Sequence, residues 1–269
     1  MKKQQTILVP TDFSERAKNA IDQAIHVASR IDARIIIYHV YHRPTTERAQ
    51  KVSLENLKKK IDRNFDKLSG SFPDLKKIPC EFRKELGLTV EKITDLVNKD
   101  GIDMLIMATK GASGFNEVWG TKTAKIIKQI KTPVFVIPDN TSLKDMNKIA
   151  LACDYSLKTD ENAIGLLTDL AEKLDFEIDV VTLNREEKTM TKKEHENRDH
   201  LVRQMGNDHS NFKFTQHAEV DKGIMAYAKA NNIDAVVLFP KNYSFIEQMF
   251  HESLTEKMVF NSPIPLIVI

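Results

Sequence analysis

The sequence contains few cysteines and no long hydrophobic run. Only 2 of its 269 residues are cysteine, Cys80 and Cys153, which argues against a disulfide framework and is typical of a reducing compartment. The longest apolar segments, such as residues 102–108 with Asp103 inside them, are too short to cross a bilayer. A strand is expected from Thr6, which leaves no room for a secretory signal, so we expect a cytoplasmic protein.

The sequence also has little net charge. Its 40 basic and 38 acidic residues give +2, which is too small to indicate a nucleic-acid partner without clustering. The lysine-rich segment 57–61 alternates with Asp62 and Asp66, which favours a solvated helix face over a membrane or RNA contact. We therefore expect neither nucleic acid nor membrane as a partner.

Segments of the first half return in the second half in the same order. The pairs are Ile7–Asp12 with Ile149–Asp154, Lys18–Ile21 with Glu161–Ile164, Ile102–Met107 with Ile233–Leu238, and Pro133–Ile137 with Pro265–Ile269. A colinear repeat over this length predicts a duplicated domain. We place the two domains at residues 1–139 and 146–269, joined by a polar linker at 140–145.

Each half alternates short β-branched segments with helical patterns, which predicts βαβ units around a parallel sheet. The first half should have strands near 6–9, 34–40, 79–84, 104–108 and 134–137, and helices near 14–31, before 70, 90–98 and 122–130. The second should have strands near 148–152, 177–183, 212–217, 234–239 and 265–269, and helices near 160–174, 190–205, 222–231 and 252–260.

Such a sheet binds ligands where the strand order reverses, outside the carboxyl ends of the strands. If the first strand lies between the second and the fourth, residues 10–12 and 109–111 meet at that reversal. The turn that follows differs between the halves: Lys110-Gly-Ala-Ser-Gly114 and Gly120-Thr-Lys-Thr123 are replaced by Lys241-Asn-Tyr-Ser-Phe245 and Glu252-Ser-Leu-Thr255. Glycines let the backbone approach an anion, and a helix beginning near Thr121 would add free amides. Because Glu252 would repel a phosphate, we expect a nucleotide only in the first half.

Together these segments resemble the universal stress protein family in two tandem copies. The resemblance rests on Ile7–Asp12, Tyr38–Val40, Gly87–Ile93, Met107–Gly114, Gly120–Thr123 and the closing strand after Pro133. It implies an α/β fold of two doubly wound domains, each a five-stranded parallel sheet of order 3-2-1-4-5 with helices on both faces. It further implies that the closing strands, Val134–Ile137 and Leu266–Ile269, pair edge to edge as an internal pseudo-dimer. Association of two chains into a homodimer stays an open alternative.

The resemblance also implies a stress-response protein that binds ATP in the first domain as a regulatory ligand. The implied phosphate contacts are Gly111, Gly114, Gly120, Thr121 and Thr123, and the implied adenine or ribose contacts are Thr11, Asp12 and Val40. Asp12 would also help to hold Mg²⁺ with the nucleotide; its alternative role is to cap the first helix, with Glu15 completing a capping box. The spacer 115–119 is shorter than in family members that bind ATP.

Two other functions stay open. A slow ATP hydrolase or phosphotransferase could use the same pocket, although Asp12 is its one obvious general base. A ligand-free dimerisation scaffold is favoured by the short spacer, with the glycines then making only a tight turn. Cys153 is expected to be an unreactive thiol, because the neighbouring carboxylate of Asp154 raises its pKa.

Overall fold

The computed structural model describes residues 4–43, 54–109, 118–156, 158–183, 189–206, 210–239, 258–259 and 262–269. Its strands form one ten-stranded sheet of order β3-β2-β1-β4-β5-β10-β9-β6-β7-β8. The first half contributes β1 (Thr6–Pro10), β2 (Arg34–Tyr41), β3 (Cys80–Leu86), β4 (Met104–Ala108) and β5 (Val134–Ile137). The second contributes β6 (Lys148–Ala152), β7 (Glu177–Leu183), β8 (Ser210–Thr215), β9 (Ala235–Leu238) and β10 (Leu266–Val268). The predicted α/β fold with strand order 3-2-1-4-5 is confirmed.

The two halves of the sheet meet at the strands that close each half. Strand β10 pairs antiparallel with β5, with Ile267 opposite Phe135, whereas the other strand pairs are parallel. Both of these residues are buried. The edge-to-edge pairing of the closing strands is therefore as predicted, while the domain boundaries in the intervening segment stay a prediction.

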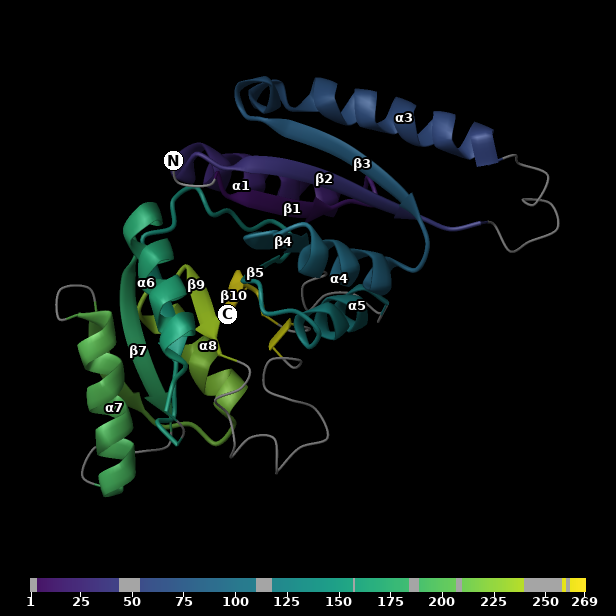
Figure 1. Cartoon of the computed structure of the whole chain (residues 1–269). Helices are drawn as coiled ribbons and strands as arrows, with labels where there is room; N and C mark the ends of the chain where they lie inside the picture. Colours follow the sequence, from purple (N-terminus) through teal and green to yellow (C-terminus); the bar gives the residue numbers. More distant parts are fainter. Residues whose placement is uncertain are drawn as a thin grey trace.

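Helices cover both faces of the sheet (Figure 1). One core lies under α1 (Glu15–Ile31), α3 (Leu54–Ser71), α6 (Glu161–Leu174) and α7 (Lys192–Met205). The other lies under α4 (Thr89–Lys99), α5 (Val118–Ile127) and α8 (Val220–Ala230), and it includes Met258 and Val259. A short 3₁₀ helix, η1 (Pro73–Lys77), was not predicted; Pro73 stands at its first position, where the missing N–H costs no hydrogen bond.

The repeated Ile-Asp pairs of the sequence have the same structural role in both halves. The Oδ2 of Asp103 accepts the Thr6 amide at 2.8 Å, and the Oδ2 of Asp234 accepts the Lys148 amide at 2.9 Å. Each carboxylate thus satisfies a backbone donor at the start of the first strand of its half. This part of the repeat serves the sheet and lies at the opposite end of the strands from the predicted crevice.

The second half buries a carboxylate in its core. The side chain of Asp179 on β7 is fully buried and accepts hydrogen bonds from Lys148 Nζ (2.8 Å), Tyr227 Oη (2.8 Å) and Asn211 Nδ2 (3.3 Å). Burial raises the pKa of Asp179, but these donors together bring it below its ordinary value. Asp179 occupies the register position that Ile36 has in the first half. The second half thus has a buried carboxylate with its donors where the first half has an apolar side chain.

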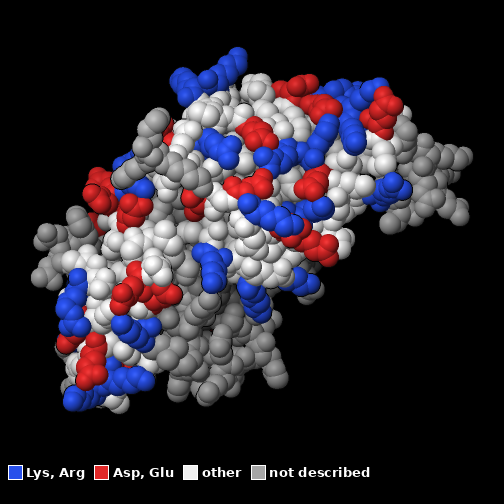
Figure 2. Space-filling view, in the orientation of Figure 1, with Lys and Arg blue, Asp and Glu red and all other residues white. Residues whose placement is uncertain are grey.

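The charged side chains on the surface agree with the small net charge of the chain. On the face shown in Figure 2, acidic and basic side chains are intermingled. Within the described ranges, none of the helices combines the length and the apolar character that a membrane span requires.

Candidate functional site

A pocket opens at the carboxyl ends of β1 and β4, where the strand order reverses. These strands are parallel neighbours, with Ile7 opposite Met104. The pocket's lining residues are Pro10, Asp12, Ser14, Arg16, Ala17, Met107, Ala108 and Thr109. The reversal therefore carries a pocket in the first half, as the sequence predicts.

The loop that enters the pocket from β1 is held by its own side chains. The Phe13 amide donates to Thr11 Oγ1 at 3.0 Å, and the Ser14 amide donates to Asp12 Oδ1 at 3.0 Å. Phe13 adopts a left-handed conformation with a φ of 67°. These two amides are consequently occupied within the loop. Asp12 is exposed, and its second carboxylate oxygen has no hydrogen-bond partner among the described residues.

Helix α1 begins two residues later than a cap at Asp12 would require. Its N-cap is Ser14, whose side chain accepts the Ala17 amide at 3.3 Å. The predicted capping box of Asp12 with Glu15 is therefore wrong: both Asp12 and Ser14 have capping chemistry, and Asp12 instead stabilises the turn before the cap. Because Ser14 already accepts the Ala17 amide, the start of α1 contributes mainly the positive end of its helix dipole beside the pocket.

Arg16 adds a positive charge that the sequence analysis did not assign. It lies in the first turn of α1 and lines the pocket, and its Nε lies 3.2 Å from Asp139 Oδ1. The two side chains are 40% and 32% exposed, so this ion pair is only weakly held. The sequence feature that could have identified Arg16 is its place two residues after Ser14, the N-cap of a helix that starts at the crevice.

The end of β2 contacts the loop that follows β1. The Nδ1 of His39 lies 2.7 Å from the Thr11 carbonyl oxygen, to which it donates, and the ring lies 4.5 Å from that of Phe13. Burial lowers the pKa of His39, against the opposing effect of the Thr11 hydrogen bond, so the ring is neutral at pH 7. Val40, a predicted adenine or ribose contact, is partly buried against the core beneath α4.

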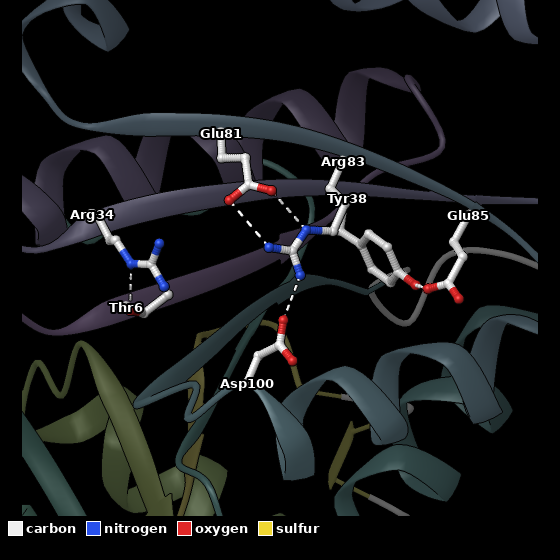
Figure 3. Close-up of polar contacts among 7 residues, drawn as sticks. All are labelled: Thr6, Arg34, Tyr38, Glu81, Arg83, Glu85 and Asp100. Atoms are coloured by element: carbon white, nitrogen blue, oxygen red, sulfur yellow. Dashed lines mark hydrogen bonds and ion pairs between the residues drawn. The ribbon is translucent and has the colours of Figure 1, made fainter.

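Polar contacts join β2, β3 and the end of α4, and Figure 3 shows those of Tyr38 with Glu85 and of Arg83 with Glu81 and Asp100. The buried Tyr38 donates to Glu85 at 2.5 Å, and Lys92 lies 2.6 Å from the same carboxylate. The hydrogen bond from Lys92, followed by that from Tyr38, lowers the pKa of Glu85; burial and Glu85 raise the pKa of Tyr38. Arg83 similarly joins Glu81 at 2.7 Å to Asp100 at 2.6 Å.

Gly87 accounts for part of the motif that follows β3. Its φ is +154°, and a Cβ atom there would lie 2.5 Å from Lys92 Cε. A side chain would push Lys92 away from Glu85. The glycine that carries the family resemblance at this point therefore serves the network rather than a ligand.

The predicted phosphate contacts are only partly described. Gly111 and Gly114 lie outside the described residues. Helix α5 begins at Val118 and not near Thr121, so Gly120 and Thr121 lie inside its first turns and Thr123 lies further along it. The expectation that Thr121 opens the helix is wrong, because Gly120 does not interrupt it. Thr123 is fully buried, and its Oγ1 has no hydrogen-bond partner among the residues that the structure describes.

The second half reaches the rim of this site. Thr109 Oγ1, at the end of β4, donates to the Val259 carbonyl oxygen at 3.4 Å. Thr109 is buried, and Val259 packs into the core shared by α4 and α5. The last residue before the glycine-containing segment is thus in contact with the C-terminal part of the chain.

Comparisons with known proteins agree with this architecture. The family model described as the Universal stress protein family matches residues 4–138, which is half of the 269-residue chain. The chain belongs to the Universal stress protein family. The matched residues span β1 to β5 and hence the crevice and both of its bordering strands.

Individual universal stress proteins are similar to this chain at low identity. Universal stress protein MJ0577 of Methanocaldococcus jannaschii is 26% identical over 155 residues, covering 51% of this chain and 96% of that protein. Universal stress protein A homolog 1 of Coxiella burnetii is 26% identical over 125 residues, covering 45% and 87%. The structure of a universal stress protein from Archaeoglobus fulgidus superimposes with a TM-score of 0.72 at 14% identity, covering 98% of this chain and 95% of that one. This last likeness shows the fold of the whole chain.

Proposed function

We propose that the first domain, residues 1–139, binds ATP as a regulatory, non-enzymatic ligand in the crevice between β1 and β4. The observation that carries the proposal is the pocket at the strand-order reversal, bordered by the start of α1 and by Thr109, which directly precedes Lys110–Gly114 in the sequence. Ligands of open α/β sheets bind at this position, and helix starts favour anions. Membership in the Universal stress protein family supports a stress-response role in the cytoplasm.

The proposed ligand is the nucleotide with Mg²⁺, and Asp12 is the predicted contact that lines the pocket among the described residues. Thr11, Asp12 and Val40 would contact adenine or ribose, and Gly111, Gly114, Gly120 and Thr121 would contact the phosphates. Thr123 is fully buried, so it would act only by shaping the loop. Mg²⁺ is commonly held by one or two carboxylates together with substrate phosphates. Asp12 offers one such oxygen, and the described residues contain no cluster of three or more acidic, His or Cys side chains that could hold a metal without the nucleotide.

The second domain, residues 146–269, would lack this ligand. Lys241–Phe245 replaces the glycines, and Glu252 adds a charge of the sign that repels phosphate. The two domains would form an internal pseudo-dimer in which one copy binds ATP and the other supplies packing.

Calorimetric titration of the full chain with ATP and Mg²⁺ tests the proposal. The wild-type protein should bind one ATP per chain, and at 100 times Kd the ligand should add about 2.7 kcal/mol to the unfolding free energy. Gly114→Glu should abolish this binding, whereas Ser244→Glu, the same charge in the corresponding loop of the second half, should preserve it. Equal and negligible binding by all three proteins would refute the proposal, and ADP release by the wild type would favour the hydrolase alternative.

A further inference from the structure

Arg16 is shared between the crevice and the segment that leaves the first domain. Its side chain lines the pocket, and its Nε lies 3.2 Å from the carboxylate of Asp139. Asp139 stands two residues after the end of β5, at the start of the segment that leads to β6. This contact is the one ion pair that joins Arg16 to another described residue.

The rest of that segment is attached to α1 without Arg16. Asn19 Nδ2 donates to the Thr141 carbonyl oxygen at 3.2 Å, and the Leu143 amide donates to Gln23 Oε1 at 2.7 Å. Lys144 also pairs with Asp22 at 2.7 Å. Of these contacts along α1, only that of Arg16 is made by a residue that also lines the pocket. Arg16 could therefore leave Asp139 without detaching the linker.

The pair between Arg16 and Asp139 is easily exchanged for a stronger one. It is partly exposed on both sides, and a guanidinium has five N–H donors, more than a single carboxylate accepts. A polyphosphate carries more charge than one carboxylate and can accept two parallel hydrogen bonds from an arginine. The positive end of the α1 dipole attracts the same kind of anion.

We propose, on the basis of the ATP site proposed above, that Arg16 recognises the phosphate charge of the ligand and leaves Asp139 to do so. Arg16 is then the residue that distinguishes a nucleotide polyphosphate from an uncharged nucleoside. Asp139 acts as the competing partner that holds Arg16 while the crevice is empty. Ligand binding would release Asp139 at the start of the interdomain segment.

Titrations of full-length variants with ATP, AMP and adenosine test this role. Arg16→Gln should weaken ATP binding about tenfold, the size of one charged hydrogen bond at a partly exposed site, and should leave adenosine affinity within about twofold. Asp139→Asn should tighten ATP binding about threefold, because the competing carboxylate is neutralised. In the Arg16→Gln, Asp139→Asn double variant, the effect of Asp139→Asn should disappear.

Matched controls remove the same charges elsewhere. Arg30→Gln acts at the far end of the same helix, about 21 Å away at 1.5 Å per residue, and Asp145→Asn acts further along the linker. Both should bind ATP as the wild type does. ATP binding that is unchanged by Arg16→Gln, or lost equally for ATP and adenosine, would overturn the role of Arg16 alone. Absence of ATP binding by the wild-type protein would overturn the proposed function and this role together.

Discussion

Replacing Asp179 with asparagine should lower the free energy of unfolding by about 3 kcal/mol, because the buried carboxylate holds three donors. Loss of its charge leaves Lys148 without its ion-pair partner at 2.8 Å and places an amide group among the donors of Tyr227 and Asn211. Hydrogen bonds to a charged group are each worth about 1.5–3 kcal/mol. Lys148 is 29% exposed and regains some hydration, which keeps the expected loss at the lower end of the range for breaking a buried pair.

Urea unfolding at neutral and acidic pH measures this contribution. The pKa of Asp179 lies below its ordinary value of 3.8, so the folded state favours the carboxylate. The stability difference between wild type and Asp179→Asn should be complete above about pH 4 and should disappear as the pH falls through the lower folded-state pKa. Asp169→Asn is the matched control, since its ion pair with Lys173 lies at the surface and should contribute less than about 0.5 kcal/mol. Equally small losses for both variants would refute the reasoning.

Three further predictions concern other parts of the chain. Gly87→Ala should lower the free energy of unfolding by about 1–2 kcal/mol, because Gly87 has a φ of +154° and lies close to Lys92. Gly70→Ala, with open space around it in α3, should instead raise that free energy by up to about 1 kcal/mol, and thermal unfolding compares the two variants. Burial raises the pKa of Cys80 to about 11 and that of Cys153 to about 12. Neither thiol should therefore react with an aromatic disulfide reagent at pH 7.5 until urea unfolds the protein, and rapid labelling of the folded protein would contradict this. Asp103→Ala should cost about 1–2 kcal/mol by leaving the Thr6 amide unsatisfied, whereas Asp95→Ala, at an exposed ion pair, should change the stability little. Denaturant titration compares the two variants, and a larger loss for Asp95→Ala would contradict the role of Asp103.

The strands were predictable because their signal is local. Residues 104–108, 134–137, 148–152 and 177–183 are short β-branched or apolar segments, and the structure places strands at these positions. The strand order came from the family resemblance, which the two repeated copies of the motifs carry. The segment 210–215 was predicted two residues too late, since an edge strand such as β8 carries a weaker alternation than a buried one.

The details of the site depended on contacts that the sequence does not display. Asp12 and Ser14 both suit an N-cap, and the left-handed conformation of Phe13 decides which of them caps α1. Gly120 suggested a helix boundary, but one glycine costs only about 1 kcal/mol inside a helix that has a buried face. The position of Arg16 at the pocket follows from where Ser14 starts the helix, and its pairing with Asp139 joins residues far apart in the sequence.

A crystal structure of the full chain grown with ATP and Mg²⁺ would test the central claim most directly. We expect one nucleotide per chain, between the carboxyl ends of β1 and β4, with its phosphates near the start of α1 and the Gly111–Gly114 segment. An empty crevice at saturating ATP, or a nucleotide bound only in the second half, would contradict the account.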